Sequence, residues 1–226
     1  MASDAPRADV PSANGRPDGA SLAARPGQGP DARAAGGASL AGRRFFCSWS
    51  GGKDAYLALQ RATLGRGRPS ALVCMLHEGG RVSRGHGLPL ALLEEQAAAL
   101  DIPLVTRAAT WDGYEAAYVS VLHELAAQGV EAGVFGDIDL QAHRDWVEGV
   151  CDIAGLTCHL PLWREQRRRL VAEFLAGGSR ATIVAVDSSK LGAEFLGLEL
   201  DDDVIARLEA AGADVCGEEG EYHTMV

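Results

Sequence analysis

Apolar and polar positions alternate along residues 43–226 in two different rhythms. Short continuous apolar runs predict buried strands, at 45–49, 71–76, 103–105, 133–135, 158–162 and 182–186. Apolar residues that recur every three or four positions predict the helices between them, over 55–63, 88–100, 114–125, 140–155, 164–176 and 204–208. Strands that alternate with helices indicate an α/β fold, a parallel sheet with helices on both faces.

The pattern is absent from the first 42 residues, which are rich in Ala, Gly, Pro, Arg, Asp and Ser. Such a segment buries too little apolar surface to offset the entropy of ordering it, so we expect a disordered tail over residues 1–42. Alternation is regular over residues 43–139 and changes character afterwards. We therefore expect a core sheet over 43–139 and a smaller C-terminal α/β lobe over 140–226.

Composition narrows the class of protein. Hydrophobic residues make up 47% and charged residues 23%, as in ordinary globular proteins, and no apolar run approaches the roughly 20 residues that span a bilayer. An acid and a proline near Met1 argue against an export signal, and five cysteines without a C-x-x-C pair favour free thiols in the cytoplasm. The net charge of −10 argues against nucleic acid, although Arg167–Arg169 form either a local basic site or a solvated helix face.

A glycine turn follows the first predicted strand and opens the first helix. It reads Ser50-Gly51-Gly52-Lys53-Asp54, and Lys53 is one of only two lysines in the chain. Adjacent glycines let an anion approach the backbone, and the first N–H groups of the helix point at it. The turn therefore predicts a phosphate site with Lys53 as a mobile cation. A Walker loop is excluded, because Cys47 and Asp54 stand where it needs Gly and Ser or Thr.

Ligands of open parallel sheets gather beyond the carboxyl ends of the strands. Besides the glycine turn, the residues at these positions are His77 and the segment Gly136-Asp137-Ile138-Asp139. The C-terminal stretch Glu218-Glu219-Gly220-Glu221-Tyr222-His223-Thr224 adds carboxylates, an imidazole and a hydroxyl.

Three stretches resemble one family. The glycine turn is similar to the SGGxDS loop of N-type ATP pyrophosphatases, which split ATP into AMP and pyrophosphate, and departs from it at Ala55, where Ser is usual. Residues 136–163 and the closing run 214–224 resemble the diphthine–ammonia ligase family, whose closing motif is G-E-x-G-E-[FY]-H-T. Together they cover most of residues 43–226.

The resemblance implies a Rossmann-like, adenine nucleotide alpha-hydrolase-type core that uses ATP and Mg²⁺. It implies that a carboxylate is adenylated and that free ammonium then supplies the nitrogen of an amide. Residues 43–139 would bind ATP, and residues 140–226 would form the substrate side. The acceptor would be diphthine on translation elongation factor 2; a bacterial source, which the Arg-rich and Ala-rich usage also fits, would require another carboxylate.

The same resemblance assigns roles to individual residues. Ser50, Gly51, Gly52 and Lys53 would hold the pyrophosphate, with Gly136, Asp137 and Thr224 also at the nucleotide. Asp54 would position Mg²⁺, or else cap the helix. Glu218 and Glu221 would be available to bind a metal ion, to bind ammonium or to accept a proton, and His223 would act as acid or base.

Other residues have two open interpretations. Asp137, Asp139 and His143 resemble a metal cluster, although Asp139 and His143 equally fit a helix cap and a first-turn residue. His143 and Arg144 fit either a substrate contact or a surface role. His77 and His86 indicate surface histidines more than nucleotide contacts, and Trp146 and Trp163 indicate core. Ser188, Ser189 and Lys190 hold an anion or start a helix. Two rival functions remain: a PP-loop enzyme that modifies tRNA bases, and an ATP-binding sensor without turnover.

Overall fold

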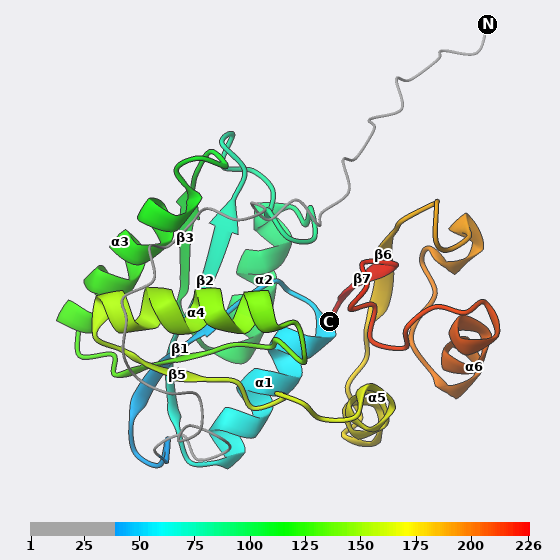
Figure 1. The fold of residues 1–226 in the computed structure, drawn as a ribbon, viewed down its shortest axis with the longest axis horizontal. Coiled ribbons are helices and arrows are strands. Elements are labelled where there is room, and N and C mark those ends of the chain that lie inside the picture. The colour runs from blue at the N-terminus through cyan, green and yellow to red at the C-terminus, as the bar shows by residue number, and fades with distance from the viewer. Residues whose placement is uncertain (1–38) are drawn as a thin grey trace, which may run out of the picture.

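A computed structural model describes residues 39–226 of the chain (Figure 1). The expected disordered tail lies outside the described residues except for 39–42, where Leu40 is buried in the core. Six helices, one 3-10 turn and seven strands follow, in the order β1 (Arg44–Ser48), α1 (Lys53–Leu64), β2 (Arg68–Leu76), α2 (Leu90–Leu100), β3 (Leu104–Ala108), α3 (Tyr114–Ala127), β4 (Ala132–Val134), α4 (Gln141–Ala154), β5 (Thr157–His159), α5 (Arg167–Ala176), β6 (Thr182–Val186), η1 (Ala193–Phe195), α6 (Asp202–Ala210) and β7 (Tyr222–Met225).

The main sheet contains five parallel strands in the order β3-β2-β1-β4-β5. Alternate side chains of β1 enter opposite layers of core, because successive residues of a strand point to opposite faces. Phe45 and Cys47 pack in the layer that contains α1 and α2, and Phe46 packs in the layer that contains α3 and α4. The predicted α/β class, with helices on both faces of a parallel sheet, is confirmed.

The strand order reverses between β1 and β4, so the carboxyl ends of these two strands flank the crevice where such sheets bind ligands. Gly136, just after β4, lies against the first turn of α1. A Cβ atom at this position would come within 2.8 Å of the backbone carbon and oxygen of Asp54. Only glycine permits this approach, which joins the end of β4 to the start of α1.

A second, two-stranded sheet pairs β6 with β7 in antiparallel fashion. Its residues Ile183 and Tyr222 share one core with α1, α5 and α6. The sequence pattern did not predict β7, which is four residues long and follows an acidic turn. The expected boundary after residue 139 falls inside the main sheet, because α4 and β5 lie beyond it and β5 pairs with β4. The division into two functional lobes stays a prediction.

All five cysteines are free thiols, as expected, and four of them are buried. Within residues 39–226, no helix combines the length and the apolar character needed to cross a membrane.

Gly133 of β4 provides a test of the sheet packing. A Cβ atom there would come within 2.6 Å of Phe46 Cζ and 2.8 Å of Phe135 Cε2, and both rings are almost fully buried. We expect Gly133→Ala to lower the free energy of unfolding by about 1–3 kcal/mol through overpacking, measured by urea denaturation. The control is Gly149→Ala in α4, where nothing lies within 4 Å. It should gain about 0.5–1 kcal/mol of helix propensity, and equal effects of the two variants would contradict this packing.

Candidate active site

The glycine turn lies at the carboxyl end of β1, and two other segments cover it. Gly51 has a φ of +82°, and a Cβ atom there would come within 2.6 Å of Leu88 Cδ1. At Gly52, the N-cap of α1, a Cβ atom would come within 2.5 Å of His86 Cε1. Because the two glycines have no side chain, the loop after β2 can pack directly against the turn. Ser50 Oγ accepts a hydrogen bond from the Gly52 N–H at 3.3 Å.

The C-terminal strand β7 docks on this turn. The Lys53 N–H donates to Thr224 Oγ1 at 3.1 Å, and the Val226 N–H donates to the Gly51 carbonyl at 3.0 Å. These bonds join residues that are more than 170 positions apart in the chain. The closing motif and the glycine turn, which the sequence predicted as two halves of one site, are thus in direct contact.

Gln96 of α2 holds the two segments together. Its buried amide donates to the Gly51 carbonyl at 3.0 Å and to the Val226 carbonyl at 2.7 Å, and its Oε1 accepts from Trp49 Nε1 at 3.0 Å. In the sequence Gln96 is one more position at helical spacing, and nothing there distinguishes it as the residue that bridges α2, the turn and β7.

Lys53 is not the mobile cation that the sequence suggested. The residue is only 3% exposed, and its Nζ donates to Asp54 Oδ2 at 2.7 Å and to the Cys216 carbonyl, 5.6 Å from the centre of the Tyr222 ring. Burial alone would lower the pKa of Lys53, but Asp54, Tyr222 and Cys216 together outweigh it and the pKa is raised. Its ammonium group therefore joins α1 to the closing motif.

Burial in the site raises the pKa of two carboxyl groups, Asp54 and Glu218. The pKa of Glu218 is raised to about 8, and nearby Asp54 and Asp137 add to the effect of burial while Lys53 and Arg167 oppose it. The backbone N–H of Glu218 donates to Asp214 Oδ2 at 2.8 Å, which fixes the turn that carries it. A carboxyl group that titrates near neutral pH suits proton transfer.

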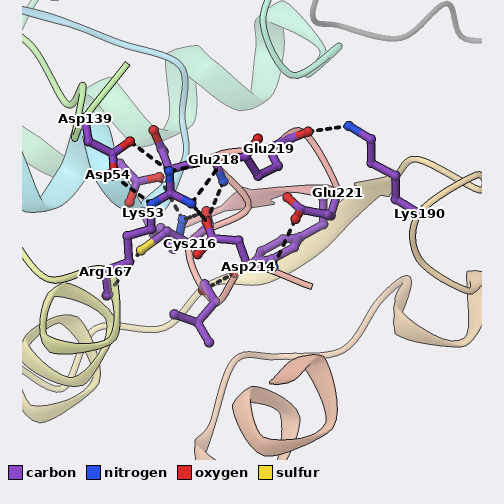
Figure 2. A network of polar contacts seen from close by, with 12 residues as sticks. Lys53, Asp54, Asp139, Arg167, Lys190, Asp214, Cys216, Glu218, Glu219 and Glu221 are labelled. Carbon is purple, nitrogen blue, oxygen red and sulfur yellow. Dashed lines mark hydrogen bonds and ion pairs between the residues drawn. The ribbon is translucent and has the colours of Figure 1, made fainter. Parts of the chain in front are cut away.

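Arg167, at the start of α5, joins the main sheet to the closing motif (Figure 2). Its guanidinium contacts both oxygens of Asp139 at 2.8 and 2.9 Å, Asp214 at 3.2 Å and Glu219 at 3.3 Å. The sequence could not single it out, because Arg168 and Arg169 beside it look the same. Asp139 therefore pairs with Arg167 and does not cap a helix, since the N-cap of α4 is Leu140.

Glu221 and Glu218 contact different partners. Glu221 is 6% exposed, and its Oε1 accepts a hydrogen bond from the Asp214 N–H at 3.0 Å. This bond stabilises the turn between Asp214 and Glu221. In Figure 2 the Glu221 side chain lies on the opposite side of Asp214 from Lys53 and Asp54. The structure thus gives Glu221 a bracing contact, whereas Glu218 lies among the charged groups.

His86 and His223 stack on each other above Gly52. Their ring centroids are 4.5 Å apart with an angle of 23° between the planes, and His86 Nδ1 lies 3.0 Å from the Thr224 carbonyl. Burial lowers the pKa of both imidazoles, to about 3 for His86. His86, which the sequence indicated as a surface residue, is therefore part of the site, whereas His77 is exposed.

The weaker candidates lie around this centre. Asp137 Oδ1 is 3.1 Å from Nδ1 of His143, which lies in the first turn of α4. Arg144 pairs with Glu148 and stacks on Trp163 at 5.1 Å. Next to Ser188, the Asp187 carboxylate accepts a hydrogen bond from the Ser189 N–H at 3.0 Å. Lys190 Nζ donates to the Glu219 carbonyl.

The parallel sheet, the strand-order reversal and the glycine turn at a helix N-terminus define a Rossmann-like nucleotide-binding protein of the PP-loop class. A family model described as "Diphthamide synthase N-terminal domain" matches residues 43–158, more than half of the chain. The chain belongs to this family, whose members use ATP through a PP-loop of the ATP pyrophosphatase type.

One solved structure that matches is titled "The crystal structure of predicted subunit of tRNA methyltransferase from Methanocaldococcus jannaschii DSM". The match has 18% sequence identity and a TM-score of 0.41, and covers 81% of this chain and 96% of that one. No curated protein sequence matches the chain.

The raised pKa of Glu218 predicts a pH-dependent stability. Because the folded value of about 8 exceeds the ordinary 4.5, the native state binds more protons than the unfolded state between these values, and stability falls as the pH rises through this window. Glu218→Gln cannot ionise and escapes this loss. We expect its stability relative to wild type to increase between about pH 5 and about pH 9 in denaturant titrations.

The control is Glu95→Gln in α2, where the side chain is exposed and lies outside the closing motif. Its stability difference from wild type should stay constant over the same range. A constant difference for Glu218→Gln as well would contradict the burial of an ionisable Glu218.

Proposed function

We propose that the protein is an ATP-dependent, AMP-forming ligase that adenylates a carboxylate and converts it to an amide with ammonia, as in diphthine–ammonia ligase. The observation that carries the proposal is the docking of the closing motif on the glycine turn Ser50-Gly51-Gly52-Lys53-Asp54, which is the PP-loop of this chain. It brings the Thr224 hydroxyl to the N-terminus of α1 and Glu218 to the neighbourhood of Asp54.

The start of α1 fits a pyrophosphate group. The N-terminus of a helix attracts anions through its dipole and its first N–H groups, and the turn Ser50-Gly51-Gly52 leads directly into it. Thr224 Oγ1 accepts from the Lys53 N–H, so its own hydroxyl proton is available to a phosphate oxygen. Thr224 thereby supplies a hydroxyl at a turn where Ala55 has none.

Mg²⁺ fits the site as a partner of the nucleotide phosphates. Within the described part of the chain, no three His, Cys, Asp or Glu side chains are arranged to hold a metal ion. Mg²⁺ commonly takes only one or two carboxylates and completes its shell with phosphates and water. Asp54, at the first turn of α1 and 24% exposed, is the carboxylate we assign to it, and the ion would neutralise charge on the leaving pyrophosphate.

Glu218 is the group we assign to proton transfer. Ammonium must lose a proton before nitrogen can attack an acyl-adenylate, and a base is most effective when its pKa lies near the working pH. The value of about 8 meets this condition. Glu221 and His223, which we also expected in catalysis, act in this proposal as supports: Glu221 through the Asp214 N–H and His223 through the His86 ring.

In this proposal the two parts of the chain have different roles in the reaction. Residues 43–139 carry the PP-loop together with Gly136 and Asp137 beside the nucleotide, and residues 140–226 carry the acceptor side. We propose a carboxylate acceptor of the diphthine type, on translation elongation factor 2. Lys53 and Arg167 position the closing motif against the PP-loop.

The test is an assay of the full chain with Mg-ATP, ammonium chloride and elongation factor 2 that carries diphthine. We expect AMP and pyrophosphate in equal amounts, and a mass change in the acceptor that corresponds to replacement of OH by NH2. Glu218→Gln should lower kcat by about a hundredfold to ten-thousandfold, as loss of a general base does, with little change in ATP affinity. The control Glu95→Gln, on the exposed face of α2, should retain wild-type turnover.

Release of ADP and phosphate would contradict the proposal. ATP binding without acceptor-dependent pyrophosphate release, for diphthine and for free carboxylates alike, would favour a sensor without turnover.

A further inference from the structure

The loop after β2 places one imidazole directly on the phosphate turn. His86 is half-buried there, and its Cε1 lies 2.5 Å from the position that a Cβ of Gly52 would occupy. Nε2 is bonded to Cε1, so this nitrogen also lies at the N-terminus of α1. A histidine side chain therefore packs against the turn, whereas the Lys53 ammonium contacts Asp54 and the Cys216 carbonyl.

The hydrogen bond of His86 fixes its tautomer. The Thr224 carbonyl, 3.0 Å from Nδ1, can only accept, so Nδ1 carries the proton. In the neutral ring Nε2 then has a lone pair and no proton. Within residues 39–226 this nitrogen has no hydrogen-bond partner, and it is available to a ligand at the turn.

The groups that face His86 from neighbouring elements oppose its protonation in the free protein. They are His223 of β7, stacked on its ring, and the Lys53 ammonium of α1. The Thr224 carbonyl, which bonds to Nδ1, favours protonation instead. With burial, these groups hold the pKa of His86 far below its ordinary value. An anion at the turn would reverse this balance, because a nearby negative charge favours the charged imidazolium.

The Lys53 ammonium already contacts a carboxylate and a carbonyl, so it cannot turn to an incoming anion without breaking both contacts. We propose that His86 takes up one proton from solvent at Nε2 when a pyrophosphate group binds at the glycine turn, and that the resulting imidazolium is a pyrophosphate ligand. One proton moves from the buffer to the ring, and no covalent bond of the ligand changes. This inference rests on the proposed function only for the presence of a pyrophosphate site.

The experiment is calorimetric titration of the full chain with inorganic pyrophosphate near pH 6.5, in two buffers of different ionisation enthalpy. The buffer dependence of the heat counts the protons taken up. His86→Asn keeps an amide donor for the Thr224 carbonyl but has no titrating nitrogen. We expect wild type to take up about one proton more per pyrophosphate than this variant, and to bind about tenfold more tightly.

The control is His77→Asn, an exposed histidine of the same loop, which should match wild type. Equal proton uptake in wild type and His86→Asn would overturn the inference. If His86→Asn does not bind pyrophosphate, imidazole nitrogen shifts of the wild-type protein decide the matter. Nε2 should change from the unprotonated to the protonated value on saturation, and an unchanged shift would also overturn the inference.

The measurement contains neither ammonium nor an acceptor. Failure of the amide-forming reaction therefore leaves it intact, and pyrophosphate that binds without proton uptake contradicts only the role of His86.

Discussion

The site depends on the contact between the start of α1 and the strand that closes the chain. A helix N-terminus has N–H groups without partners inside the helix, and here the first of them donates to Thr224 Oγ1. The Val226–Gly51 and Gln96 hydrogen bonds extend this contact. Because β7 pairs with β6, the docking also holds the two-stranded sheet against the glycine turn.

Charge distribution follows from the same docking. Lys53 and Arg167 each reach from the main sheet side to the closing motif, one through the Cys216 carbonyl and the other through Asp214 and Glu219. A buried charge is tolerated when it is paired and hydrogen-bonded, which explains why Lys53 carries Asp54 beside it. Glu218 is less well accommodated, because burial among carboxylates raises its pKa and lowers the stability of the fold at high pH. Arrangements that lower stability locally are common at functional sites.

The sequence predicted the sheet and the glycine turn, because apolar runs and glycines report local backbone structure directly. The pairing of the turn with the closing motif was predicted by the family resemblance. It did not predict the direction of Lys53, which is set by Asp54 and by a carbonyl more than 160 residues away. Gln96 and Arg167 resemble ordinary helix positions until α2 and α5 are placed beside the closing motif. His86 lies in a glycine-rich loop whose path depends on the packing of Leu88 against Gly51, a contact that no local pattern encodes.

The most direct test of the central claim, that the closing strand completes the pyrophosphate site, is the affinity for Mg-ATP of Thr224→Val compared with Thr224→Ser. Valine keeps the shape of the side chain but removes the hydroxyl, whereas serine keeps the hydroxyl. A hydrogen bond to a charged group contributes about 1.5–3 kcal/mol, so Thr224→Val should bind Mg-ATP about ten to a hundred times more weakly, and Thr224→Ser about as well as wild type. A folded Thr224→Val protein with wild-type affinity would contradict the claim.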